Sequence, residues 1–233
     1  MPFPTSPRAA ALLMLSQLAV IAAAAASSTA RSGAAVISHS YDYASLACPP
    51  SSAPSTLLTP TYGDQGAVFT VCSSLSIAAP AALVRDAVLD FRAYGRWNSF
   101  VVSVSLPPDV AETPRDLYEG MPMVFTTAGL VGGLNTTSDE VLTILDGRGV
   151  GADGKPYLLV AWRYDDKMGG LGARAEHPVI VVDQGDGSSW YLSYETYYVG
   201  LTTPAIALLK TKLLLQFDAQ SADLKAYVEG LLR

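Results

Sequence analysis

The chain has 233 residues, half of them hydrophobic, and a formal net charge of −6 at pH 7. An acidic chain without a cluster of Lys and Arg is repelled by phosphate backbones, which argues against nucleic acid as a partner. The length suits one domain with a substantial core.

Residues 1–30 have the pattern of a secretory signal peptide. Arg8 is the only charge in this stretch, and an apolar run over 9–26 and a group of small residues follow it. A retained membrane anchor is the alternative, but the run is rich in alanine and interrupted by Ser16 and Gln17, which weakens its transfer into lipid. We therefore expect a secreted protein with no stable membrane span after cleavage.

Residues 31–65 are rich in Ser, Ala, Pro and Thr, so we expect an extended arm here and the folded domain over 66–233. The arm contains Cys48, and the other cysteine is Cys72. In an oxidising compartment this pair is expected to form a disulfide, although two buried free thiols are the alternative. Asn135 begins an Asn-Thr-Thr sequon, a predicted glycosylation site if the protein is secreted from a eukaryote.

The first regular element is a predicted strand over 67–77, because apolar residues between Phe69 and Ile77 recur on one face. Cys72 falls on the polar face, where an arm packed outside the sheet could reach it. Pro80 begins a predicted helix with one apolar face, and the segment 94–97 breaks it. Six strands are expected at 99–106, 121–128, 138–145, 157–163, 173–182 and 189–198, separated by Gly- and Asp-rich turns typical of an antiparallel meander.

The chain closes with a long predicted helix that has Thr203 as its N-cap and Pro204 as its first residue. Its apolar stripe comprises Leu209, Leu213, Phe217, Leu224, Val228 and Leu231. Further leucines at 208, 214 and 215 widen the apolar face in the first half. A helix with this much apolar surface requires a concave partner.

This order of elements resembles the SRPBCC superfamily, which includes START domains, polyketide cyclase-like proteins and coenzyme Q-binding proteins. The resemblance covers about residues 66–233 and rests on SIAAPAALVRDAVLDFRAYGRWNSFVVSV at 76–104, RAEHPVIVV at 174–182 and SSWYLSYETYYVG at 188–200. It implies an α+β helix-grip fold: a curved seven-stranded antiparallel sheet wrapped round the C-terminal helix, with a cavity between them. Members mostly bind or carry hydrophobic molecules, and some catalyse cyclisation or dehydration.

Three residues are candidates for acid–base chemistry: Glu195, Glu176 and His177. In an apolar cavity a carboxylate or an imidazole has a shifted pKa and can move protons on a bound substrate. The alternative is that Glu195 or Glu176 pairs across strands with an arginine, Arg163 or Arg174, and contributes little beyond register. Neither face of the last strand is purely apolar, so both remain candidates for lining the cavity.

The candidate ligand-binding residues come from the entry helix, the aromatic strands and the C-terminal helix. They are Trp97, Trp162, Tyr194, Tyr197, Leu209, Leu213 and Phe217. Aromatic side chains shape pockets for planar ligands, although each of these also suits an ordinary core. We expect the ligand between 205–217 and the strands that carry the aromatic residues.

Two further patterns do not predict a site. The segment 149–155 resembles a phosphate-binding loop, but Pro156 stands where Ser or Thr is needed and a strand follows, so we expect a hairpin loop. The two histidines and two cysteines lack the spacing of metal ligands, so no metal is expected.

The sequence thus predicts a secreted, cofactor-free protein that holds a small hydrophobic molecule between sheet and helix. The alternative is a polyketide cyclase- or isomerase-like enzyme of secondary metabolism that uses Glu195, Glu176 or His177. A third hypothesis is a surface protein whose own side chains fill the cavity. A charged group facing an open cavity would favour the enzyme, and an entirely apolar lining the carrier. No oligomeric state is predicted.

Overall fold

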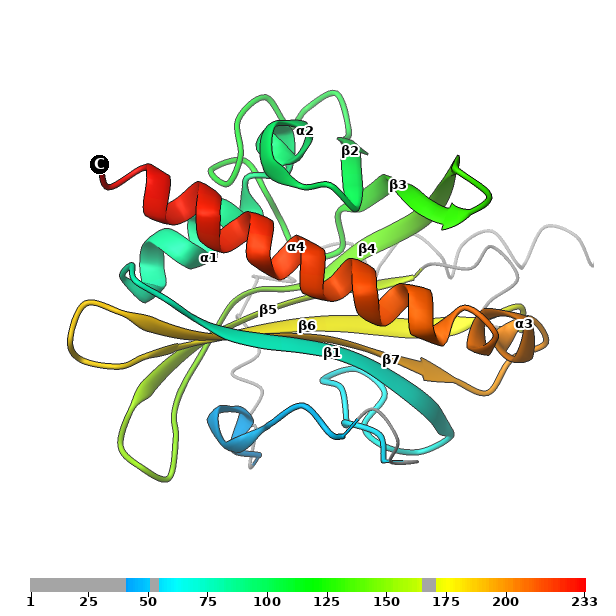
Figure 1. The fold of residues 1–233 in the computed structure, drawn as a ribbon, viewed down its shortest axis with the longest axis horizontal. Helices are drawn as coiled ribbons and strands as arrows, with labels where there is room; N and C mark the ends of the chain where they lie inside the picture. The colour runs from blue at the N-terminus through cyan, green and yellow to red at the C-terminus, as the bar shows by residue number, and fades with distance from the viewer. Residues whose placement is uncertain (1–40, 51–54, 165–170) are drawn as a thin grey trace, which may run out of the picture. The chain divides into compact units, whose positions relative to one another are not determined.

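The computed structural model describes residues 41–50, 55–164 and 171–233 (Figure 1), which belong to one compact unit spanning 40–233. The predicted signal peptide at 1–30 and the arm residues 31–40 lie outside the described residues. No helix in the described part of the chain combines the length and the apolar character that crossing a bilayer requires.

Seven antiparallel strands form one curved sheet in the order β1-β7-β6-β5-β4-β3-β2 (Figure 1). Their bounds are β1 Ala67–Ile77, β2 Val101–Ser105, β3 Pro122–Val131, β4 Leu134–Val150, β5 Pro156–Tyr164, β6 Arg174–Asp183 and β7 Ser189–Tyr198. Strands β2 to β7 form a meander, and β1 completes the sheet by pairing with β7. The predicted fold class and the hairpin loop before Pro156 are confirmed, although β3 and β4 extend further toward each other than expected.

Two short helices connect β1 to β2. They are α1 Ala81–Leu89 and α2 Tyr94–Trp97, with a 3-10 turn η2 Phe91–Ala93 between them. Pro80 is the N-cap of α1. The turn after α2 depends on Asn98, whose Oδ1 accepts the backbone N–H groups of Phe100 at 3.0 Å and Val101 at 2.8 Å. The Asn98 side chain thus satisfies two backbone N–H groups that follow the end of α2 and are not bonded within the helix.

The single C-terminal helix expected from the sequence is in fact two helices. They are α3 Thr203–Ala207 and α4 Lys210–Gly230, with Thr202 rather than Thr203 as the N-cap of α3. Thr203 Oγ1 instead donates to the Tyr198 carbonyl at 2.6 Å, which joins the start of α3 to β7. Helix α4 lies across one face of the sheet, which we call the concave face (Figure 1). Its buried side chains belong to the same apolar core as those of the strands.

Part of the predicted apolar stripe does not face the sheet. Leu213, Phe217, Leu224 and Val228 are buried as expected, whereas Leu208 is 86% exposed and Leu215 is 65% exposed. Leu208 lies where the two helices break, and Leu215 is two positions after the buried Leu213, more than half a turn around the helix. Leu231, beyond the end of α4, is also exposed.

The opposite face of the sheet, which we call the outer face, is covered by the described arm residues 41–50 and 55–65 (Figure 1). Cys48 of the arm and Cys72 of β1 form a disulfide, as predicted. Buried residues of the arm and of the outer face, among them Tyr43, Ile180 and Leu192, form an apolar cluster separate from the main core. The arm therefore buries the second face of the sheet.

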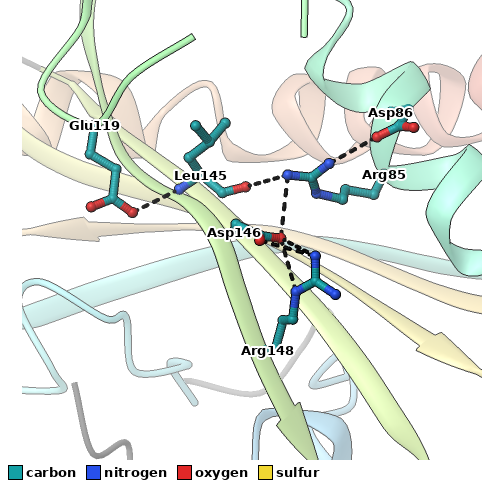
Figure 2. Close-up of polar contacts among 6 residues, drawn as sticks. All are labelled: Arg85, Asp86, Glu119, Leu145, Asp146 and Arg148. Atoms are coloured by element: carbon teal, nitrogen blue, oxygen red, sulfur yellow. Dashed lines mark hydrogen bonds and ion pairs between the residues drawn. The ribbon is translucent and has the colours of Figure 1, made fainter. Parts of the chain in front are cut away.

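The end of the sheet near α1 contains an irregular stretch of β4. Its register with β5 shifts twice between Leu142 and Gly147, which leaves main-chain groups without ladder partners. Figure 2 shows how side chains replace them: Arg85 of α1 donates to the Leu145 carbonyl at 3.1 Å, and the Glu119 carboxylate accepts the Leu145 N–H at 3.1 Å. Asp146 is held between Arg85 and Arg148.

Candidate functional site

A cavity of about 300 Å³ lies between the concave face and the C-terminal helices. Strands β2 to β7 contribute residues to its wall, and α3 and α4 cover it. Most of its lining is apolar or aromatic, including Phe100, Phe125, Leu130, Trp162, Tyr164, Ile206, Leu209, Leu213 and Phe217. The polar exceptions with chemical interest are Glu140, His177, Glu195, Tyr197 and Gln220.

The structure shows which face of β7 lines the cavity. Glu195 and Tyr197 line it, whereas Tyr194, the residue immediately before Glu195, faces the arm. Side chains alternate across a strand, so this parity applies along β7. The same alternation in β6 places His177 at the cavity and its neighbour Glu176 on the outer face.

Glu195 is a partly buried carboxyl group in this apolar setting. Tyr197 donates a hydrogen bond to its Oε2 at 2.8 Å, and Phe69 stacks on the Tyr197 ring at 4.6 Å between centroids. Burial raises the pKa of Glu195 to about 7, against the opposing effect of the Tyr197 hydrogen bond. A carboxyl group with this pKa exchanges a proton near neutral pH, so Glu195 has the properties of a general acid or base.

His177 lies between two aromatic rings of the cavity wall. Its ring centroid is 4.5 Å from that of Trp162 and 4.9 Å from that of Phe217. Its Nε2 is 2.7 Å from Ser193 Oγ. Burial lowers the pKa of His177 to about 3, so the imidazole is neutral at physiological pH and contributes a polar but uncharged surface.

Glu176 is fully buried on the outer face, away from the cavity. Its carboxylate accepts the Thr61 N–H at 2.8 Å, the Thr61 hydroxyl at 2.6 Å and the Thr143 hydroxyl at 3.0 Å. These contacts tie the arm to β6 and β4. The structure therefore separates Glu176 from the other two acid–base candidates and places it in a structural position. Arg174 instead places its guanidinium 5.5 Å from the Tyr62 ring centroid.

Five of the seven candidate ligand-binding residues line the cavity: Trp162, Tyr197, Leu209, Leu213 and Phe217. Tyr194 does not, because it points to the outer face and donates to the Leu58 carbonyl of the arm at 2.6 Å. Trp97 does not either, because it stacks on Tyr227 near the other end of α4.

Sequence reasoning did not single out Gln220, Glu140, Phe100 or Phe125. Gln220 lies seven residues after Leu213 on α4, which places both on one face of the helix. That spacing is the sequence signal that identifies Gln220 as a residue of the buried face. Phe100 and Phe125 belong to β2, β3 and their connections, whose approach to α4 depends on the curvature of the sheet.

The remaining sequence predictions concern the surface. Asn135 is exposed near the tip of the β3–β4 hairpin, and Thr136 and Thr137 beside it line the cavity. Glycosylation there stays a prediction. The described residues contain no group of three or more His, Cys, Asp and Glu side chains that could hold a metal ion.

No family model matches the sequence, and no curated protein matches it. Solved structures do. The Zhui aromatase/cyclase from Streptomyces sp. R1128 has a TM-score of 0.51 and 13% identity, over 71% of this chain and 96% of that chain. Norcoclaurine synthase from Thalictrum flavum has a TM-score of 0.49 and 15% identity, over 72% and 98% of the two chains. A START superfamily protein from Mycobacterium smegmatis has a TM-score of 0.44 and 17% identity, over 70% and 98%.

Identities this low concern the fold alone. Together with the seven-stranded sheet and α4, the likeness to the aromatase/cyclase shows that this chain has a helix-grip fold. The fold that the resemblance implied is therefore confirmed.

Proposed function

We propose that this protein binds a small hydrophobic molecule in the cavity between the sheet and α4. The observation that carries the proposal is the space of about 300 Å³ lined mainly by aromatic and aliphatic side chains. Protein interiors are packed to crystal-like density, and voids larger than a water molecule are few. Pockets of this size and lining are typical of small-molecule sites. The empty volume also argues against the hypothesis that side chains fill the interior.

A tryptophan scan of α4 tests this proposal. Leu213→Trp places an indole in the cavity, whereas Leu215→Trp adds the same ring at a solvent-exposed position of the same helix. We expect the parent and Leu215→Trp to bind the neutral fluorescent probe N-phenyl-1-naphthylamine, and Leu213→Trp to lose binding. Overpacking a filled core costs about 1–3 kcal/mol, and less where empty volume receives the ring. A parent that binds no probe, with Leu213→Trp strongly destabilised, would mean that the interior is packed solid.

We also propose that the protein is secreted after removal of about residues 1–30. The disulfide between Cys48 and Cys72 supports this, because disulfides form and persist in oxidising compartments. N-terminal sequencing of protein recovered from the secretory route should find a start near Ser27 or Arg31. Secreted material that retains Met1 would contradict the proposal.

A second candidate function is acid–base catalysis by Glu195 on the bound molecule. The observation that favours it is a carboxyl group with a pKa of about 7 at the wall of a ligand-sized cavity. Deuterium exchange at the α-carbon of 2-tetralone, followed by NMR, tests for proton transfer without knowledge of the natural substrate. We expect the parent to accelerate exchange over buffer and Glu195→Gln to lose the acceleration. Equal exchange rates in the parent and in Glu195→Gln would contradict catalysis by Glu195 and would not bear on the binding proposal.

A further inference from the structure

The cavity lining carries two hydrogen-bond acceptors, one on α4 and one on β7, that the described residues leave unsatisfied or only partly satisfied. Gln220 is only 4% exposed and lines the cavity, yet its carboxamide oxygen has no hydrogen-bond partner among the described residues. A buried acceptor without a partner costs about 1–3 kcal/mol. Gln220 differs from the other unsatisfied buried groups in lining the cavity, where a ligand is a source of the missing donor.

Glu195 offers a second acceptor in the same cavity. Among the described residues, only Tyr197 donates a hydrogen bond to this carboxyl group, and it does so to Oε2. An ionised carboxylate in an apolar site with one hydrogen bond is poorly compensated for its lost hydration. An incoming donor, above all a charged one, would therefore gain more here than at a solvated carboxylate.

The described lining contains no cation to complete this pair. Neither Lys nor Arg is among the described residues that line the cavity, and His177 is buried between two rings with its Nε2 directed at Ser193. The other titratable groups of the lining are Glu140 of β4, Tyr164 of β5 and Tyr197 of β7, while α3 and α4 contribute none. The Glu195 carboxyl group is therefore not matched by a lysine or arginine among the described lining residues.

We propose that the ligand is an apolar molecule of about the size of an aromatic ring system that carries a protonated amine. This inference rests on the proposed binding function and makes it more specific. The ligand's ammonium group pairs with the Glu195 carboxylate, and the carboxamide oxygen of Gln220 accepts a further N–H or O–H of the ligand. The aromatic rings of the lining, such as Phe217 and Trp162, suit both the apolar body and a neighbouring cation.

The alternatives fit the lining less well. A carboxylate ligand would place like charges together in a site of low dielectric constant. A neutral alcohol could satisfy Gln220, but it would leave the Glu195 carboxylate without a counter-charge. An amine satisfies both groups.

Three naphthalene probes of nearly equal size separate these cases. They are 2-(2-naphthyl)ethylamine, which is cationic, 2-(2-naphthyl)ethanol, which is neutral, and 3-(2-naphthyl)propanoate, which is anionic. Calorimetric titration of the full chain at pH 8 should show the amine binding at least tenfold more tightly than the alcohol and the propanoate most weakly. Because the Glu195 pKa is about 7, the amine should bind about tenfold more weakly at pH 6 than at pH 8, whereas the alcohol should not.

Matched variants assign the preference to Glu195. Glu195→Gln keeps the shape and an acceptor for Tyr197, and should reduce the amine-to-alcohol ratio to about one. Glu112→Gln removes the same charge from the exposed pair with Arg115 and should leave the ratio unchanged. Equal affinities for amine and alcohol in the parent, or a preference that survives Glu195→Gln, would overturn the amine assignment alone. Failure of all three probes to bind would overturn the proposed function with it.

Discussion

The two faces of the sheet treat a buried carboxyl group in opposite ways. Glu176 of β6 faces outward under the arm, where two threonines supply three hydrogen bonds to it. Glu195 of the neighbouring strand β7 faces the cavity, where Tyr197 is its one hydrogen-bond donor among the residues that the structure describes. Both were equal candidates in the sequence. The Glu176 carboxylate accepts three hydrogen bonds and joins the arm to the sheet. The Glu195 carboxyl group has an oxygen that accepts no hydrogen bond from the described residues, and it lies beside the cavity.

The difference teaches that burial alone does not mark a functional carboxyl group. Glu195 differs from Glu176 because its carboxyl group has few hydrogen bonds and lies at the wall of a cavity. Burial raises its pKa. Structural groups are satisfied by their own protein, whereas binding groups are completed by a ligand. Five variants test this contrast.

The largest effect is expected from Glu176→Ala. The change leaves the Thr61 N–H without its acceptor under the arm, and it removes a buried side chain. With stranded donors costing about 1–3 kcal/mol each and a cavity added, we expect a loss of about 4 kcal/mol in the free energy of unfolding. Urea denaturation measures the loss, and probe binding by the folded fraction should be unaffected. A loss below 1 kcal/mol would show that the outer-face contacts contribute little.

Removal of the disulfide should have the next largest effect. Cys48 and Cys72 are 24 residues apart, so the closed loop stabilises the fold by roughly 3 kcal/mol through the entropy of the unfolded chain. The double variant Cys48→Ser, Cys72→Ser should lose that amount while it retains probe binding, because the bond lies on the outer face. Non-reducing peptide mapping of the parent should recover the two cysteines in one linked peptide. Two alkylatable thiols in the native secreted protein would contradict the disulfide.

Glu195→Gln should instead stabilise the protein, and only at higher pH. The folded-state pKa of about 7 lies above the ordinary value of 4.5, so the folded state favours the protonated form. The parent therefore loses stability as pH rises from about 4.5 to 7, up to about 3 kcal/mol at pH 8. Glutamine is neutral throughout, so the variant should match the parent near pH 4.5 and exceed it at pH 8. Thermal unfolding at the two pH values measures this, and a pH-independent difference would argue against a perturbed Glu195.

The smallest effect is expected from Tyr194→Phe, with Tyr197→Phe as its partner. Tyr194 donates to the Leu58 carbonyl on the outer face, so loss of its hydroxyl should cost about 1 kcal/mol and leave probe affinity unchanged. Tyr197 donates to Glu195 at the cavity, so loss of its hydroxyl should change probe affinity. Fluorescence titrations measure the probe affinity of both variants. If Tyr194→Phe changed probe affinity as strongly as Tyr197→Phe, the two faces of the sheet would not be independent.

The fold was largely predictable because its signals are local. Alternation in β1, Gly- and Asp-rich turns and the apolar face of α4 each specify an element without reference to its partners. The break between α3 and α4 was not predictable in this way, since no proline or glycine marks positions 208 and 209.

The site was less predictable because it depends on strand parity. Tyr194 and Tyr197 are both aromatic, and the last strand is buried on both faces, so its sequence lacks the alternation that would identify the inner side. Only the arm, which covers the outer face, explains why both sets of residues are buried. Leu213 and Phe217 were identified correctly because an amphipathic helix buries only its apolar face, and the sequence spacing shows which residues form that face.

The arm also limits how far this chain can be shortened. The elements of the helix-grip fold begin at Ala67, yet a version starting there would uncover Leu159, Ile180, Leu192 and Tyr194, which lie beneath the arm. A contiguous apolar sheet surface of this kind promotes self-association. It would also lack Cys48, leaving Cys72 as a free thiol on that same surface. A soluble recombinant form should therefore start before Asp42.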